Sequence, residues 1–181
     1  PNRLPRVYHS GDTGDIDYLL KYCRQAFPNR SIFTIGYSLG GNALCKWLGE
    51  NGQAKVISSS PGDSLTMGQP VNSVIDGAVI VSAPYQLARC STRLDQGFSR
   101  VYRRHLISEL VGFIEQKKLM FKRLGQHKHL QQLQALGSLD AIKSFWQFDH
   151  QVIAPLHGFE SAADYYQRSS ARQYVPFIRT P

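Results

Sequence analysis

One short segment constrains the fold of this chain more than any other. Residues 36–40 read Gly-Tyr-Ser-Leu-Gly, and they lie between an apolar run at 32–35 and a helical pattern at 42–48. A serine on such a tight strand-to-helix turn is held in a strained backbone conformation that pushes its hydroxyl out of the sheet. The pattern therefore predicts a nucleophile elbow with Ser38 as the catalytic residue.

The residues around Ser38 fit this interpretation. Gly36 and Gly40 are the elbow glycines, because a helix that passes close to the strand leaves no room for side chains there. The backbone N–H of Leu39 lies at the positive end of the helix dipole, where it would donate to an oxyanion. A bare Gly-x-Ser-x-Gly match is weak, and an ordinary glycine-rich turn is the alternative. The flanking strand and helix favour the elbow.

Composition limits the remaining classes of protein. The chain has 181 residues, of which 42% are hydrophobic, and this is enough for a globular domain with a core. No apolar run approaches the roughly 20 residues of a membrane span, and no signal-peptide layout is present. A cytoplasmic chain is the expectation. Three separated cysteines without a CxxC pair favour free, buried thiols over a disulfide framework, and no metal site is expected.

The positive charge is concentrated in one stretch. Residues 86–130 hold ten Lys or Arg and three acids, while the whole chain has a net charge of +8. Apolar residues recur there at helical spacing, which predicts a long amphipathic helix with the basic residues on its other face. The expected apolar face consists of Phe98, Val101, Tyr102, Leu106, Leu110, Phe113 and Ile114. A solvated basic face is the default interpretation; peripheral contact with an anionic membrane is the alternative, and nucleic acid is not expected as a partner.

The order of elements indicates a layered α/β domain. Asp12 is expected to cap a helix whose apolar face is Ile16, Leu19, Leu20, Cys23 and Phe27. A buried strand at 31–35, a helix to about Glu50, a loop at 51–73 and a second buried strand at 78–81 follow.

Helical periodicity dominates the second half of the chain, from Leu87 to Tyr166. Ser138 is expected to cap one amphipathic helix that includes Leu139 to Trp146, and 159–166 fits another. The tail at 174–181 is bounded by proline and is expected to be extended, as a connector to a further strand would be.

Several of these segments together resemble the YheT-type esterases of the α/β-hydrolase superfamily. The resemblance spans nearly the whole chain and is carried by residues 3–11, 36–42, 81–84, 96–102, 157–159 and 164–166. It implies an α/β-hydrolase fold with a mostly parallel, partial sheet and an inserted helical cap. Residues 1–84 would form the central core with the elbow, 85–170 the cap, and 171–181 a connector towards a missing core strand.

The resemblance also implies an activity. It points to a serine hydrolase of the carboxylesterase or lipase type, which cleaves acyl esters of lipid-like or short-chain type without a cofactor. Ser38 matches the nucleophile, and the chain order is Ser, then acid, then His. The acid and the histidine are expected beyond Pro181, so we expect the chain to be the middle of a larger hydrolase and to be inactive and poorly stable alone.

Substitutes for these two residues inside the chain are less favoured, because most of them lie on the expected cap helices. They are His105, His127, His129, His150 and His157, with Asp95, Asp140, Asp149 and Asp164. A non-catalytic α/β-hydrolase scaffold and a basic membrane-surface module remain as alternative functions.

Overall fold

The computed structural model describes residues 3–58 and 74–181, which group into two compact units. The sheet unit contains His9–Gln86 and Ser169–Pro181. The helical unit contains Pro1–Tyr8 and Leu87–Arg168. The N-terminal segment therefore groups with the helices rather than with the sheet, whereas the sequence analysis divided the chain after residues 84 and 170.

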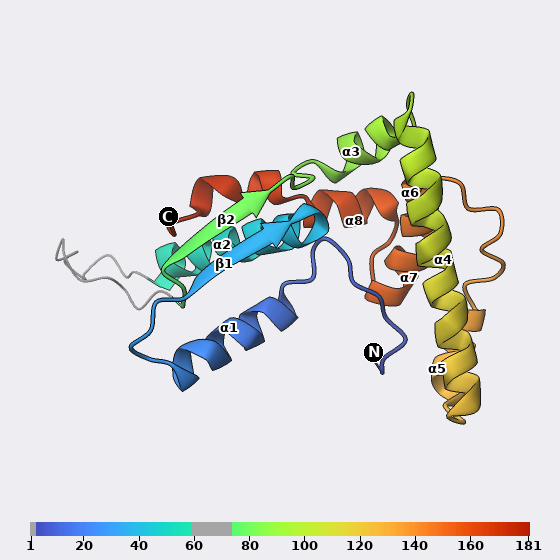
Figure 1. The fold of residues 1–181 in the computed structure, drawn as a ribbon, viewed down its shortest axis with the longest axis horizontal. Helices are drawn as coiled ribbons and strands as arrows, with labels where there is room; N and C mark the ends of the chain where they lie inside the picture. The colour runs from blue at the N-terminus through green and yellow to red at the C-terminus, as the bar shows by residue number, and fades with distance from the viewer. Residues whose placement is uncertain (1–2, 59–73) are drawn as a thin grey trace. The chain divides into compact units, whose positions relative to one another are not determined.

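The sheet unit is built on two parallel strands. β1 (Phe33–Tyr37) pairs with β2 (Gly77–Val81), with Phe33 opposite Gly77 and Tyr37 opposite Val81. Figure 1 shows α2 (Ser38–Ser58) running along this pair, and α1 (Gly14–Ala26) preceding it in the chain. Two short 3-10 turns, Ala171–Gln173 and Val175–Phe177, follow later. The α/β pattern is confirmed, as is the parallel pairing of the two strands.

Each strand packs through one face only. The core of the sheet unit joins the buried residues Leu20, Leu44, Trp47, Leu48 and Ile75. Ala78 and Ile80 pack against this core from β2. On the other face Phe33 is 72% exposed and Ile35 is 60% exposed. The prediction of fully buried strands is therefore wrong in this structure, because α2 covers one side of the pair.

A polar clamp fixes the start of the two strands. The Asp76 carboxylate accepts the Ile32 N–H at 2.7 Å and a guanidinium N–H of Arg24 at 2.7 Å. These donors hold the pKa of Asp76 below its ordinary value, with the backbone N–H as the larger cause. At the outer edge of β2, the Ala78 N–H donates to the Pro181 carbonyl at 2.9 Å. The chain end therefore lies against the edge of β2.

The helical unit is arranged around α4 (Ser99–Arg123). It also contains α3 (Leu87–Leu94), α5 (His127–Gln134), α6 (Phe145–Phe148), a π-helical turn (Asp149–Ile153), α7 (Ala154–His157) and α8 (Ala162–Ser169). Figure 1 shows α5 beside the end of α4. The most buried core side chains include Ile114, Phe121, Leu133 and Val152. Because these helices share a hydrophobic core of their own, they form a separate unit.

A buried lysine attaches the N-terminal segment to this unit. Lys117 is 3% exposed, and its Nζ donates to the carbonyl oxygens of Leu4 and Arg6, each at 2.6 Å. Burial lowers the pKa of Lys117, and the nearby Arg6 adds a smaller effect in the same direction. The sequence placed Lys117 among solvated basic residues, and this was wrong.

The apolar face predicted for α4 was also wrong in its first half. Phe98 is 88% exposed, Val101 63% and Tyr102 59%, whereas Ile107 and Ile114 are buried. Both sides of α4 carry apolar residues at helical spacing, so periodicity alone could not tell which side packs.

Other boundaries differ from the expected ones. Thr13 rather than Asp12 precedes α1, without a side-chain cap, and Thr13 Oγ1 donates to Glu50 instead at 2.9 Å. α2 continues through residues 51–58, which were expected to form a loop, while the rest of that loop lies outside the described residues. Ser144 rather than Ser138 caps a helix, by accepting the Gln147 N–H. The tail turns through 3-10 geometry before it becomes extended at Ile178.

Candidate functional site

Ser38 lies at the junction between β1 and α2. The strand ends at Tyr37, the helix begins at Ser38, and Ser38 is exposed. Its φ is 49°, in the left-handed region that non-glycine residues rarely adopt. A serine with this backbone geometry, directly between a parallel strand and a helix, is the arrangement that the elbow pattern predicts.

The strand and the helix approach each other closely beneath Ser38. A Cβ on Gly36 would lie 2.8 Å from both the Gly40 carbonyl oxygen and the Gly41 Cα. A Cβ on Gly41 would lie 2.9 Å from the Gly36 carbonyl oxygen, whereas a Cβ on Gly40 would meet no atom within 4 Å. The close approach expected at Gly40 therefore falls at Gly41. Gly40 contributes its backbone carbonyl to the contact, while its own Cβ position is open.

The start of α2 supplies the electrostatics of the site. Leu39 is the residue after Ser38, in the first turn of a 21-residue helix. Backbone N–H groups of a first helical turn have no partner within the helix and carry its positive dipole end. The position of Leu39 is thus suited to donate to an oxyanion that forms beside Ser38.

Asn42 supports the elbow from inside the unit, and sequence reasoning gave it no role. The residue is fully buried, and its Nδ2 donates to the carbonyl oxygens of Ser10 at 2.8 Å and Ser169 at 2.7 Å. Its Oδ1 accepts the Ala171 N–H at 3.0 Å. One side chain therefore links three segments to the first turn of α2. A polar amide among the apolar and glycine residues of 39–45 was the available signal.

A second strained serine lies at the same edge of the sheet. Ser82 directly follows β2, is exposed and has a φ of 52°. Since Tyr37 and Val81 are register partners, Ser38 and Ser82 both follow the carboxyl ends of paired parallel strands. Ligands of open α/β sheets bind at this edge. The sequence pattern gave no reason to single out Ser82.

The proton acceptor for Ser38 is not among the contacts of the described residues. Within them, the Ser38 hydroxyl has no hydrogen bond to a histidine or a carboxylate. The histidines that follow Ser38 all lie in the helical unit, as do the four aspartates considered with them. Within the sheet unit, the structure thus brings Ser38, Leu39, Gly36 and Asn42 together.

Cys45 is the nearest other nucleophile on α2, and its environment makes it inert. It is 1% exposed, and burial raises the pKa of its thiol, so the unreactive protonated form dominates at neutral pH. Cys23 and Cys90 are partly exposed, and all three cysteines are free.

The described residues also contain no cluster of His, Cys, Asp or Glu suited to hold a metal. In the same part of the chain, no helix combines the length and apolar character that crossing a bilayer demands.

Comparison with known proteins places these features in a class. The "Putative esterase YheT" of Escherichia coli K12 is 33% identical over 181 residues, which cover 100% of this chain and 46% of that protein. A monoacylglycerol lipase of Saccharomyces cerevisiae is 29% identical over 98% of this chain and 35% of its own length. The human monoacylglycerol lipase ABHD2 is 26% identical, covering 98% of this chain and 38% of that protein.

These relatives are esterases and lipases of the α/β-hydrolase class, and the small parallel sheet with its helices is a partial form of that fold. Over its whole length the chain is similar to the YheT-type members of this class. It spans less than half of the length of the curated relatives named above. No protein-family model matches the chain, and no solved structure matches it.

Proposed function

We propose that this chain carries the nucleophile of a serine hydrolase that cleaves carboxylic acyl esters. The observation that supports it most is the backbone of Ser38, with φ of 49° between a parallel strand and a 21-residue helix. Left-handed geometry at a non-glycine residue costs free energy, and such strain concentrates at functional sites. Ester hydrolysis is also the activity in the names of the relatives.

The proposed reaction has two halves. Ser38 Oγ attacks the ester carbonyl carbon while its proton passes to a histidine, and the carbonyl oxygen becomes an oxyanion that accepts the Leu39 N–H. When the tetrahedral intermediate collapses, the alcohol leaves with that proton and the acyl group stays on Ser38. Water then attacks the acyl-enzyme, releases the carboxylic acid and restores Ser38.

The histidine, its acid and the second oxyanion donor are proposed to come from the part of the relatives' length that this chain does not span. The chain alone is accordingly proposed to be inactive. A cytoplasmic location also stays a prediction. We propose a lipid-like ester as substrate, since two of the relatives are named monoacylglycerol lipases.

Fluorophosphonate labelling with mass-spectrometric mapping tests this proposal. It should be run on this chain, on the complete protein and on its Ser38→Ala variant. We expect the label on Ser38 in the complete protein, together with turnover of monoacylglycerol that Ser38→Ala abolishes. A complete, folded protein that neither labels nor hydrolyses esters would instead indicate a non-catalytic scaffold.

A further inference from the structure

The junction between α3 and α4 exposes large apolar side chains. Phe98 is 88% exposed, Val101 63% and Tyr102 59%. In a helix, positions 98, 101 and 102 share one side, and the buried Ile107 and Ile114 lie on the other. Together these three side chains form an exposed apolar patch, a feature that contact sites have in common.

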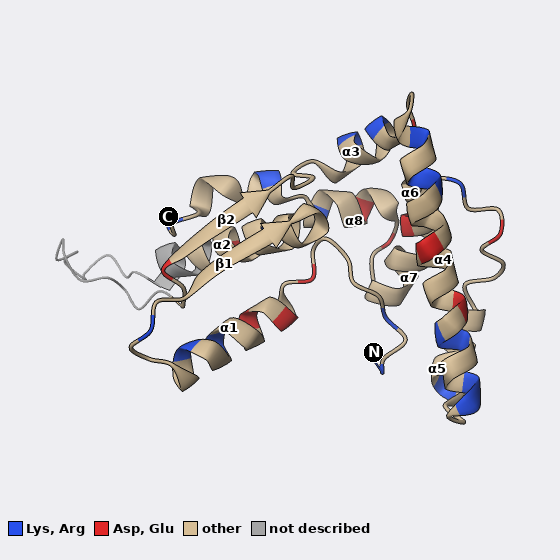
Figure 2. Ribbon diagram, in the orientation of Figure 1, with Lys and Arg blue, Asp and Glu red and all other residues tan. Residues whose placement is uncertain are grey.

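Four arginines lie on the same two helices, although by helical spacing Arg100 falls on the side of Ile107 rather than with Phe98. Arg89 and Arg93 lie on α3, and Arg100 and Arg104 lie on the first turns of α4. Figure 2 shows this concentration of basic positions along α3 and at the start of α4. We call the set of Arg89, Arg93, Phe98, Arg100, Val101, Tyr102 and Arg104 the basic corner.

Acidic residues are few near the basic corner, and the next one along α4 is Glu109, two turns after Tyr102. Asp95 is the one acid between residues 87 and 104, and its carboxylate is bound to Arg103 at 2.6 Å. Among the described residues, Arg89, Arg100 and Arg104 have no ion-pair partner. A protein partner that buried these arginines would have to supply the missing carboxylates, because unpaired buried charge is costly.

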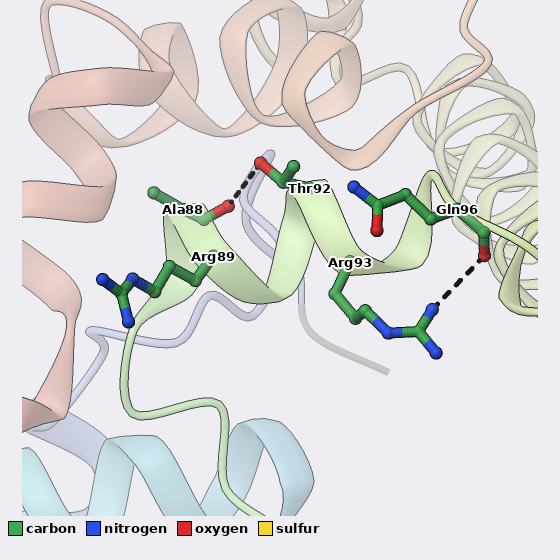
Figure 3. Close-up of a pocket in the computed structure, with 5 residues that line it drawn as sticks. All are labelled: Ala88, Arg89, Thr92, Arg93 and Gln96. Atoms are coloured by element: carbon green, nitrogen blue, oxygen red, sulfur yellow. Dashed lines mark hydrogen bonds between the residues drawn. The ribbon is translucent and has the colours of Figure 1, made fainter.

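A small pocket lies on the α3 side of the basic corner. It has a volume of about 330 Å³ and is lined by Ala88, Arg89, Thr92, Arg93 and Gln96. Figure 3 shows Arg89 and Arg93 extending from one side of α3. One Arg93 nitrogen donates to the Gln96 carbonyl at 3.3 Å and to Ser99 Oγ at 3.1 Å, which holds that guanidinium in place. The two guanidinium groups point away from each other in Figure 3, so each is placed to contact a phosphate group of its own.

We propose that the basic corner docks onto the surface of an anionic phospholipid bilayer. Phe98, Val101 and Tyr102 would enter the boundary between headgroups and acyl chains, while the arginines contact lipid phosphates. The aliphatic Val101 distinguishes this surface from a nucleic acid site. Bases stack on aromatic side chains, so Phe98 and Tyr102 would have a role in such a site and Val101 would not. The inference does not depend on Ser38, but it would bring a lipid-like ester close to the enzyme.

Vesicle co-sedimentation of the full-length protein tests the proposal. The vesicles are phosphatidylcholine with about one third phosphatidylglycerol, compared with phosphatidylcholine alone. We expect the double variant Arg100→Gln, Arg104→Gln to lower the partition coefficient by about 20-fold, from roughly fivefold per arginine at a charged bilayer. The pair Phe98→Ser, Tyr102→Ser should lower it at least 10-fold.

Matched controls separate this surface from general charge and from unfolding. Lys122→Gln with Lys128→Gln removes the same charge near the far end of α4, and Tyr18→Ser with Leu19→Ser removes exposed apolar residues of α1. Both controls should change binding less than twofold. For the lysine pair the reason is distance, because about 30 Å of helix separates Arg100 from Lys122, which exceeds the Debye length. For the α1 pair the reason is that neither residue belongs to the basic corner.

Other results would overturn the proposal. Equal losses in the control pairs would show attraction to net charge alone. Binding that an oligonucleotide displaces, and that Phe98→Ser with Tyr102→Ser does not weaken, would indicate a nucleic acid site. Equal binding to neutral vesicles would exclude a role for the arginines. Ser38→Ala should bind vesicles like the parent protein, so a failure of the proposed catalysis remains distinguishable from a failure here.

Discussion

Asn42→Ala is the change that most directly tests how the elbow is held. The substitution removes three hydrogen bonds, of 2.8, 2.7 and 3.0 Å, to the carbonyl groups of Ser10 and Ser169 and to the N–H of Ala171. The three partner residues, Ser10, Ser169 and Ala171, are each at most 5% exposed, so water cannot replace the amide. At about 1 to 2 kcal/mol for each buried group, the free energy of unfolding should fall by about 3 to 5 kcal/mol.

Urea unfolding gives the global measurement, and hydrogen exchange of the Ala171 amide gives the local one. Asn51→Ala is the matched control, because Asn51 also lies on α2 and donates one hydrogen bond, to the Trp47 carbonyl at 2.9 Å, from a partly exposed position. It should cost about 1 kcal/mol or less. A loss below 1 kcal/mol for Asn42→Ala, with unchanged exchange at Ala171, would refute the reasoning.

Three further predictions follow from other contacts. Gly36→Ala and Gly41→Ala should each destabilise the protein by about 2 kcal/mol, since the new Cβ would lie within 3 Å of backbone atoms, while Gly40→Ala should leave the thermal midpoint unchanged; equal effects at all three glycines would contradict the packing. Burial raises the pKa of Asp149 to about 7, so native Asp149 holds its proton longer than the unfolded chain does. Stability should therefore fall as pH rises from about 4 to 7, by about 2 kcal/mol for this partly exposed group, and Asp149→Asn should flatten that slope in urea titrations at each pH. Lys117→Met should cost about 2 kcal/mol and open residues 3–8 to proteolysis, whereas an unchanged digestion pattern would show that the two carbonyl contacts are dispensable.

Local patterns predicted the strand, the turn and the helix around Ser38. A short apolar run, a glycine-flanked serine and a helical pattern are adjacent in sequence, and the structure has β1, Ser38 and α2 in that order. The parallel partner β2 was also found from an apolar run. These features depend on neighbouring residues, so a single sequence is enough to find them.

Tertiary contacts explain what the sequence did not predict. Asn42 is important because of carbonyl groups that lie 32 and 127 residues away in the chain. Residues 4 and 6 group with the helical unit because Lys117 binds them, across more than 100 residues. The packed face of α4 depends on which neighbours cover it. No periodicity within one segment contains this information.

The two turns with positive φ lie against the same residue, Gly41. Ser38 and Ser82 both have positive φ, and such geometry persists only where the surrounding structure determines it. A Cβ on Gly41 would meet the Gly36 carbonyl oxygen at 2.9 Å and Ala83 Cβ at 3.1 Å, so Gly41 lies against the turn at each serine. Asn42, the next residue, fixes the helix behind it. The close approach beneath both strained turns therefore centres on Gly41, with Asn42 fixing the helix behind it, whereas a side chain on Gly40 would meet nothing within 4 Å.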